Sequence, residues 1–292
     1  MPHRFDRKTP LLIPKPLARQ LLKLYDYPDP RRPGKMIRGY DRFHALRTAR
    51  LCADVALRLG HDADRVTHFQ IACLLHDLGR AGLDRKLFGE IWSWAREREI
   101  PTRPREWRAV HPHTPYGHET EAFIVRYGAE LAAAGIVMDE WACEQVEMRL
   151  GYAGRLGRCL RSIRPQLTRM GIRWKPWMEI VMLYYYYPEK LSNVKPWVRQ
   201  LGEILVACEQ FEAYNNRQRG SDYYTRQKET LSEAFAYLAE LTQEGILSET
   251  VVSTLREMAA EGRFDGILAE ARGRVLTANE VRMLRGLRTG VA

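Results

Sequence analysis

Apolar residues recur at intervals of three and four over most of the chain, which is the spacing that places them on one face of an α-helix. One such stripe runs from Arg42 to Gly60, and a second predicted helix covers residues 64–78, where Gly79 breaks the pattern. Further helices are predicted at 118–134, 138–150, 155–164, 177–187, 198–216, 228–242, 248–260 and 277–285. The alternation typical of strands is nearly absent, with only 180–187 ambiguous, so we expect an all-α fold.

Prolines set the first 36 residues apart, because they leave room only for a short helix around Leu17–Leu24. We therefore predict an N-terminal extension at 1–36, one helical domain at 37–262 and a C-terminal helical tail at 263–292. With 292 residues, of which 45% are hydrophobic, the chain is long enough and apolar enough to bury a large core.

The formal net charge of +10 favours anionic partners, which include phosphate-containing small molecules, nucleotides and nucleic acid. Charge alone does not choose among them. The first 16 residues lack the unbroken apolar core of a secretory signal, and no stretch approaches the roughly 20 apolar residues of a membrane span. We therefore expect a cytoplasmic protein that does not bind membranes. The five cysteines are scattered without a CxxC pair, so neither a disulfide framework nor a cysteine zinc site is predicted.

The histidines indicate candidate chemistry, because all eight lie at or before His118. The string IACLLHDLGR, at 71–80, places His76 and Asp77 at the end of an otherwise apolar helix. Burying both without partners would cost several kcal/mol, and a divalent cation bound by imidazole nitrogen and carboxylate oxygen is a suitable partner. The alternatives are a buried His-Asp hydrogen bond or a helix end where both side chains reach water, since a two-residue motif has little specificity.

The surroundings of this pair resemble the HD superfamily of metal-dependent phosphohydrolases and, more narrowly, its HD-GYP branch. The segment from His44 to Arg47 is similar to the family's opening H-x-x-R and lies 32 positions before His76. The string LLHDLGRAGL is similar to the family's LLHDIGKIGIP. The resemblance covers about 40–260, so it implies an HD-domain helical bundle in which His44, His76 and Asp77 bind divalent metal.

Two further segments extend the resemblance. The string EWRAVHPHTPYG is similar to the family's E-W-(x)5-H-P-x-x-G, with Thr114 in place of its proline. This similarity implies His113 as an additional ligand, with His111 and His118 as neighbouring candidates. The string GEILVACEQFEAY is similar to G-x-I-L-A-V-A-D-x-Y-D-A-L and places Glu209 at the family's metal-binding Asp. The alternative for this residue is a solvated glutamate.

One part of the family pattern is missing between His113 and Glu209. This interval contains neither the tandem histidines of the HD-GYP branch nor its Gly-Tyr-Pro loop. Candidate replacements are Glu144 and Glu147 with Gly151-Tyr152, or Tyr184–Tyr187 followed by Pro188-Glu189. The resemblance therefore implies one or two ions, with Fe, Mn, Zn and Mg as candidates, and it weakens the inference that cyclic di-GMP is the substrate.

The function that this resemblance implies is a phosphohydrolase or phosphodiesterase acting on a nucleotide or cyclic dinucleotide. Asp77 and Arg80 are then the catalytic residues, and Arg47 and Arg80 are the residues that bind the substrate phosphate. One alternative is a catalytically inactive HD domain that senses a nucleotide or binds a partner. Another is an RNA-binding protein, which rests mainly on positive charge.

A basic segment at 155–175 departs from the family pattern, because it carries seven cations and no acidic residue. Its apolar spacing predicts an amphipathic helix interrupted by Pro165. The segment could bind phosphates, with Trp174 or Trp177 stacking on bases, but we favour a solvated basic face with packed tryptophans. The Tyr184–Tyr187 run is likewise interpreted as packing.

Overall fold

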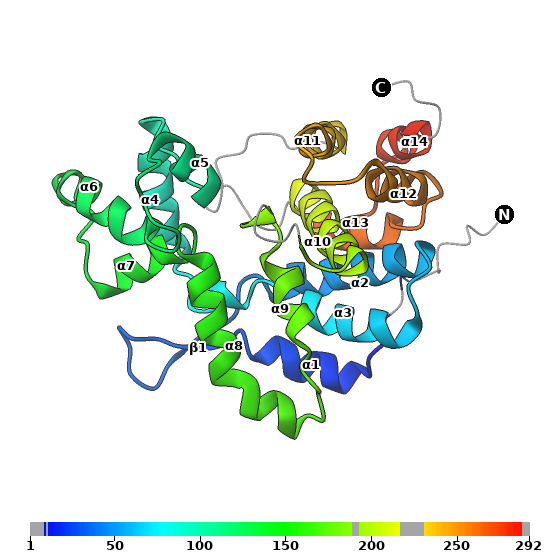
Figure 1. Ribbon diagram of the computed structural model, residues 1–292, viewed down its shortest axis with the longest axis horizontal. Coiled ribbons are helices and arrows are strands. Elements are labelled where there is room, and N and C mark those ends of the chain that lie inside the picture. The colour runs from blue at the N-terminus through cyan, green and yellow to red at the C-terminus, as the bar shows by residue number, and fades with distance from the viewer. Residues whose placement is uncertain (1–8, 10, 189–192, 217–230, 288–292) are drawn as a thin grey trace.

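Figure 1 shows the computed structural model, which describes residues 9, 11–188, 193–216 and 231–287. The fold is all-α, as the sequence predicts, and the strands of the described residues are one antiparallel pair, β1 (Tyr27–Pro28) and β2 (Met36–Ile37). The α-helices in the described part of the chain are α1 (Lys15–Lys23), α2 (Arg42–Arg58), α3 (Ala63–Leu75), α4 (Arg85–Glu97), α5 (Pro104–Val110), α6 (Glu119–Ala133), α7 (Glu140–Glu147), α8 (Tyr152–Arg169), α9 (Pro176–Leu183), α10 (Pro196–Asn215), α11 (Leu231–Gln243), α12 (Glu249–Ala260), α13 (Asp265–Arg272) and α14 (Ala278–Gly286).

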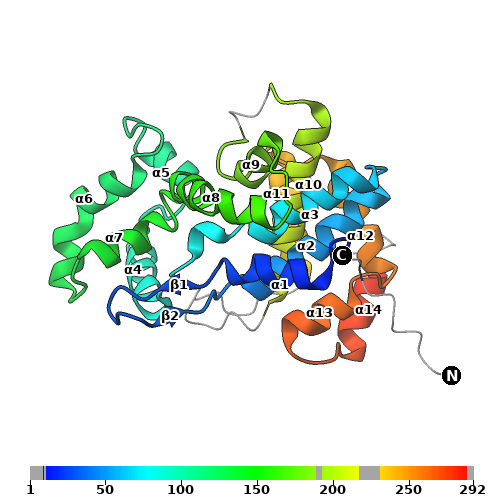
Figure 2. The ribbon, with the colours of Figure 1, turned by 90° about the horizontal axis from the view of Figure 1, so that it is seen from below.

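The larger of two cores is built on α2, which packs against α3 and α10. Small side chains explain this close packing, because Ala45, Ala49 and Ala53 are fully buried and let neighbouring helices approach. Gly60 makes the turn into α3 with a φ of 83°, a value that favours glycine. Figures 1 and 2 show α9 and α10 beside the α2–α3 pair, and α12 and α13 pack against both α2 and α10.

A second core lies in the lobe formed by α4, α5, α6 and α7, at the left of Figure 1. Its centre is aromatic, since Phe123 packs against Trp92 and Trp107 with ring centroids 5.3 and 5.9 Å apart. From this lobe α8 continues along the larger core, to which it contributes Leu156 and Leu160. The two cores are therefore joined by a helix that packs on the larger one.

The segments outside 37–262 also contribute to the larger core. Leu21 and Tyr25 of the predicted extension are buried in it, as are Phe264 and Leu268 of the predicted tail. The predicted domain limits stay predictions, but both flanking segments pack as parts of one hydrophobic core. None of the described helices combines the length and the apolarity needed to cross a bilayer.

The predicted interruption at Pro165 is wrong, because α8 runs through this residue to Arg169. Pro165 is exposed, so the carbonyl of Arg161 that loses its hydrogen bond faces the solvent side of the helix. The predicted helix at 177–187 ends earlier, at Leu183. Helices α4, α5 and α13 were not predicted; Gly89 and several aromatic residues weaken the helical propensity of α4, which burial in the second core compensates.

Candidate metal centre

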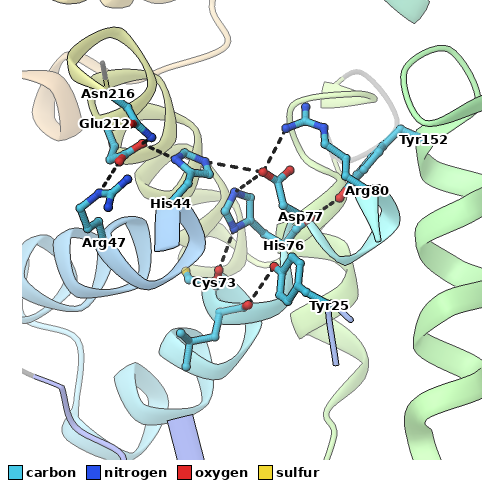
Figure 3. A network of polar contacts seen from close by, with 11 residues as sticks. Tyr25, His44, Arg47, Cys73, His76, Asp77, Arg80, Tyr152, Glu212 and Asn216 are labelled. Carbon is cyan, nitrogen blue, oxygen red and sulfur yellow. Dashed lines mark hydrogen bonds and ion pairs between the residues drawn. The ribbon is translucent and has the colours of Figure 1, made fainter. Parts of the chain in front are cut away.

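The centre is built where α3 ends, at His76 and Asp77. The last carbonyls of a helix lack partners within it, and here side chains supply them. Nδ1 of His76 donates to the Cys73 carbonyl at 2.7 Å, and the Tyr25 hydroxyl donates to the Leu74 carbonyl at 2.9 Å. The hydroxyl of Tyr152 donates to the carbonyl of His76 itself (Figure 3). The backbone that carries His76 and Asp77 is therefore held from three directions.

Tyr152 keeps its proton in this position. Burial raises the pKa of its phenol well above the ordinary value, and the nearby carboxylate of Asp77 raises it further. The hydroxyl therefore remains a hydrogen-bond donor to the His76 carbonyl throughout the pH range in which a protein is normally studied.

Arg155 fixes the turn that follows, the short 3-10 helix η1 (Leu78–Arg80). Its Nε donates to the Gly79 carbonyl at 2.8 Å and its Nη2 to the Ala81 carbonyl at 3.0 Å. Arg155 is 6% exposed and pairs with Glu144 at 3.1 Å, so this cation of the basic segment has a structural role. Other ion pairs of the segment are Arg158 with Glu147, Arg164 with Glu179 and Lys175 with Asp64.

These ion pairs give several cations of the basic segment a carboxylate partner within the protein. The two tryptophans of the segment also have a structural role. Trp174 and Trp177 are partly buried against the larger core. This arrangement favours the interpretation of a basic face with packed tryptophans, and nucleic-acid binding stays a prediction.

His44 reaches the same place from α2 and is oriented by α10. Its Nδ1 bonds to Oε2 of Glu212, which is fully buried. The other carboxylate oxygen, Oε1, accepts from Nε of Arg47 at 2.6 Å, and Nδ2 of Asn216 lies 3.5 Å from Oε2. Glu212 thus holds the imidazole from behind, on the side away from Asp77 (Figure 3).

The two imidazoles present the same nitrogen to Asp77. Because each Nδ1 faces an oxygen acceptor, we assign the ring proton to Nδ1 and the lone pair to Nε2. Both Nε2 atoms are buried without a hydrogen-bond partner, and they lie 3.6 Å (His44) and 3.8 Å (His76) from Oδ2 of Asp77. These separations are too long for a hydrogen bond, so the His-Asp bond considered as an alternative is not formed.

A divalent cation fits these three atoms. The ligand atoms of His44, His76 and Asp77 all lie within 4.8 Å of one another. Metal-ligand bonds of about 2.0–2.2 Å to nitrogen and oxygen can bridge atoms that are up to about 4 Å apart, and the distances of 3.6 and 3.8 Å from the two Nε2 atoms to Oδ2 of Asp77 meet this limit. A cation would also supply the missing partner of both buried lone pairs and balance the Asp77 charge. Hydrogen-bonded Nδ1 atoms are the usual support of metal-binding histidines.

Arg80 completes the immediate surroundings of Asp77. Its Nη1 lies 3.0 Å from Oδ2 of Asp77, and its guanidinium lies over the ring of Tyr152 at 5.6 Å from the centroid. Arg47, in contrast, is 5% exposed and is bound to Glu212 behind His44. Of the two predicted phosphate-binding arginines, Arg80 therefore lies at the cluster and Arg47 supports it.

The structure does not bring the other predicted ligands into this cluster of described residues. His113 and His118 are exposed in the loop between α5 and α6, and His111 packs on Trp107 with ring centroids 4.3 Å apart. Glu209 is partly buried on α10, where its charge raises the pKa of the buried Cys73 thiol as a minor contribution after desolvation. Their assignment as ligands stays a prediction.

Glu212 was missed in the sequence, although a signal for it exists. The buried face of α10 includes Leu201, Leu205 and Cys208, and Glu212 continues this stripe four residues after Cys208. A charged residue on an apolar helical face needs a buried partner, which here is Arg47 together with His44.

Gly79 offers a test of the backbone support. A Cβ at this position would lie 2.7 Å from Cε2 of Tyr152, so Gly79→Ala must displace the ring that anchors His76. We expect the free energy of unfolding to fall by about 1–3 kcal/mol, measured by urea denaturation. Gly154→Ala on α8 is the control, since its Cβ has room and alanine favours helix. A Gly79→Ala chain as stable as the wild type would contradict the close contact.

Comparison of the chain with family models, with curated proteins and with solved structures finds no match. The resemblance to the HD superfamily therefore stays a prediction that rests on the motifs. The geometry of the cluster is independent of that resemblance, because it follows from the positions of His44, His76 and Asp77.

Proposed function

We propose that the chain is a metal-dependent phosphohydrolase in which His44, His76 and Asp77 hold a divalent cation. The observation that carries the proposal is the pair of buried Nε2 atoms that lack hydrogen-bond partners and face one carboxylate oxygen. Two imidazoles and one carboxylate suit Fe, Mn or Zn better than Mg, which prefers oxygen ligands. A second ion, with His113 or Glu209 among its ligands, is a further prediction.

When bound, the cation supplies a Lewis acid that makes water a stronger nucleophile and draws charge from a phosphoryl oxygen. Glu212 and the Cys73 carbonyl keep the ring protons of His44 and His76 on Nδ1, which leaves both lone pairs at Nε2. Arg80 places a permanent positive charge beside Asp77, where its planar guanidinium can bind two phosphate oxygens.

A catalytically inactive HD domain, which would bind a nucleotide at the same cluster, is the second candidate. The sequence favours it in one respect, since the tandem histidines of the HD-GYP branch are missing. The two candidates differ in turnover, so an assay with a generic substrate separates them.

The test is metal-dependent hydrolysis of bis-p-nitrophenyl phosphate by the full chain. The protein is stripped with a chelator and then supplied separately with Fe, Mn, Zn or Mg. We expect p-nitrophenol release to stop on stripping and to return with at least one metal, together with stoichiometric metal by elemental analysis. A chain that binds metal without hydrolysing this ester or a cyclic dinucleotide supports the inactive domain. A chain that acquires no metal overturns the proposal.

A further inference from the structure

Two segments that lie far apart in the sequence carry cations without any acidic residue. The first, at 11–24, contains α1 and carries Lys15, Arg19 and Lys23. The second, at 155–175, forms most of α8 and carries seven cations. Neither segment can neutralise its own charge, so only carboxylates from other parts of the fold or an anionic partner can do so.

The fold places these two segments next to each other. An open groove lies between α1 and the C-terminal end of α8, and it is lined by Gln20 on α1 and by Gln166, Arg169 and Met170 at the end of α8. Figures 1 and 2 both show the two helices as neighbours. The lining therefore supplies one guanidinium and two side-chain amides, all of which can donate hydrogen bonds.

Exposed cations border the groove on both helices. Lys15, Arg19 and Lys23 follow one another at intervals of four residues, so they form a row along α1, and all three are exposed. On α8, Arg161 and Arg169 are exposed about two turns apart. Four other cations of 155–175 have the carboxylate partners described above, whereas the described residues that line the groove include no carboxylate.

Charge complementarity favours a polyanion as the partner of this groove. A nucleic-acid duplex is densely charged, with one phosphate per about 1.7 Å of its axis. Arginine binds phosphate through its planar guanidinium, and glutamine amides donate to phosphate or sugar oxygens. Because Trp174 and Trp177 pack against the larger core, they are poorly placed to stack on unpaired bases, which favours a duplex over a single strand.

An anionic membrane fits this surface less well. A helix that lies on a membrane buries an apolar face in the lipid. In the described parts of the chain, the large apolar side chains that are exposed lie outside α1 and α8, and the nearest to α1 in sequence is Met36. The surface between the two helices therefore offers charge and hydrogen-bond donors rather than an apolar anchor.

We propose that the groove between α1 and α8 binds the phosphate backbone of a nucleic-acid duplex, with Arg19, Lys23 and Arg169 as principal contacts. Contacts to phosphate carry no sequence information, so binding shows no sequence preference. The surface is independent of the proposed hydrolytic function, because none of its residues belongs to the candidate metal centre.

The test measures binding of the full, metal-stripped chain to fluorescently labelled duplexes of about 20 base pairs by anisotropy at increasing salt. One duplex is DNA and the other is RNA of the same sequence. We expect log K to fall linearly with log[salt] at a slope of about −3 to −4, as neutralisation of about four phosphates predicts. Such binding to either duplex supports the surface. The triple variant Arg19→Ala with Lys23→Ala and Arg169→Ala should reduce the slope to about −1.

The matched control is the triple variant Lys86→Ala with Arg126→Ala and Arg282→Ala. It likewise removes one lysine and two arginines, from exposed positions of α4, α6 and α14. Both triple variants lower the formal net charge from +10 to +7, so a difference between them reports the position of the charges rather than their number. The control should keep the slope and the affinity of the wild type.

Equal losses in the two triple variants would overturn the surface, because net charge alone would then drive binding. A wild-type chain that binds neither duplex overturns it as well. So does a chain that prefers single-stranded RNA, or vesicles of phosphatidylcholine with phosphatidylserine, to both duplexes. If circular dichroism shows the first triple variant unfolded, the single variants Arg19→Ala, Lys23→Ala and Arg169→Ala decide, each with an expected reduction of the slope by about 1.

Discussion

Replacing His76 and Asp77 together by alanine is expected to lower kcat/KM for bis-p-nitrophenyl phosphate by about 1,000-fold or more. The double variant removes the buried Nε2 lone pair of His76 together with the Asp77 carboxylate. Of the three proposed ligands, only His44 then remains to bind a cation. Elemental analysis should show the loss of bound metal in the same protein. The fold should persist, because neither of these side chains contributes to the hydrophobic cores.

The matched control is the double variant His68→Ala with Asp64→Ala, which removes the same residue types from α3. That pair is separated by 3.7 Å and lies near the surface. Activity and metal content should remain at the wild-type level. Hydrolysis that survives the removal of His76 and Asp77 would exclude the mechanism, whatever the metal content of the protein.

Glu212→Ala is expected to reduce the free energy of unfolding by about 3–5 kcal/mol, because it leaves the Arg47 guanidinium buried without its carboxylate. It also removes the acceptor that orients His44, so metal affinity should fall by about 10- to 100-fold. Urea denaturation and metal titration measure the two effects separately. Such a loss is a large part of the 5–15 kcal/mol that is typical of folded domains.

Two further variants keep this prediction testable if the alanine variant does not fold. Glu212→Gln preserves the shape and one acceptor, so we expect a smaller loss of stability with reduced metal affinity. The double variant Arg47→Leu with Glu212→Leu removes both charges, so it should regain stability without regaining metal. Glu209→Ala is the control on α10: Glu209 is only partly buried, and its removal should cost less than about 1 kcal/mol. Equal losses in the free energy of unfolding at positions 209 and 212 would contradict the buried support that Glu212 is assigned.

The two metal-binding candidates at the end of α3 illustrate what local sequence can predict. His76 and Asp77 follow an apolar stripe that fixes where the helix lies, and Gly79 indicates where it ends. His44 could be paired with them only through the family resemblance, since 32 residues separate it from His76. The pairing of Glu212 with His44 spans 168 residues, and no local pattern specifies which of the three glutamates on α10 meets a histidine on α2.

The sequence by itself determined the all-α fold, because helical periodicity is a local property that burial of one face reinforces. It also determined that His76 and Asp77 stand at a helix end beside an apolar core. Only the tertiary structure decided that Glu212 supports His44, that Arg155 holds the turn after Asp77 and that His113 lies in an exposed loop. These contacts depend on how α2, α8 and α10 pack, and packing is decided by the shapes of whole helix faces rather than by the spacing of residues within one helix.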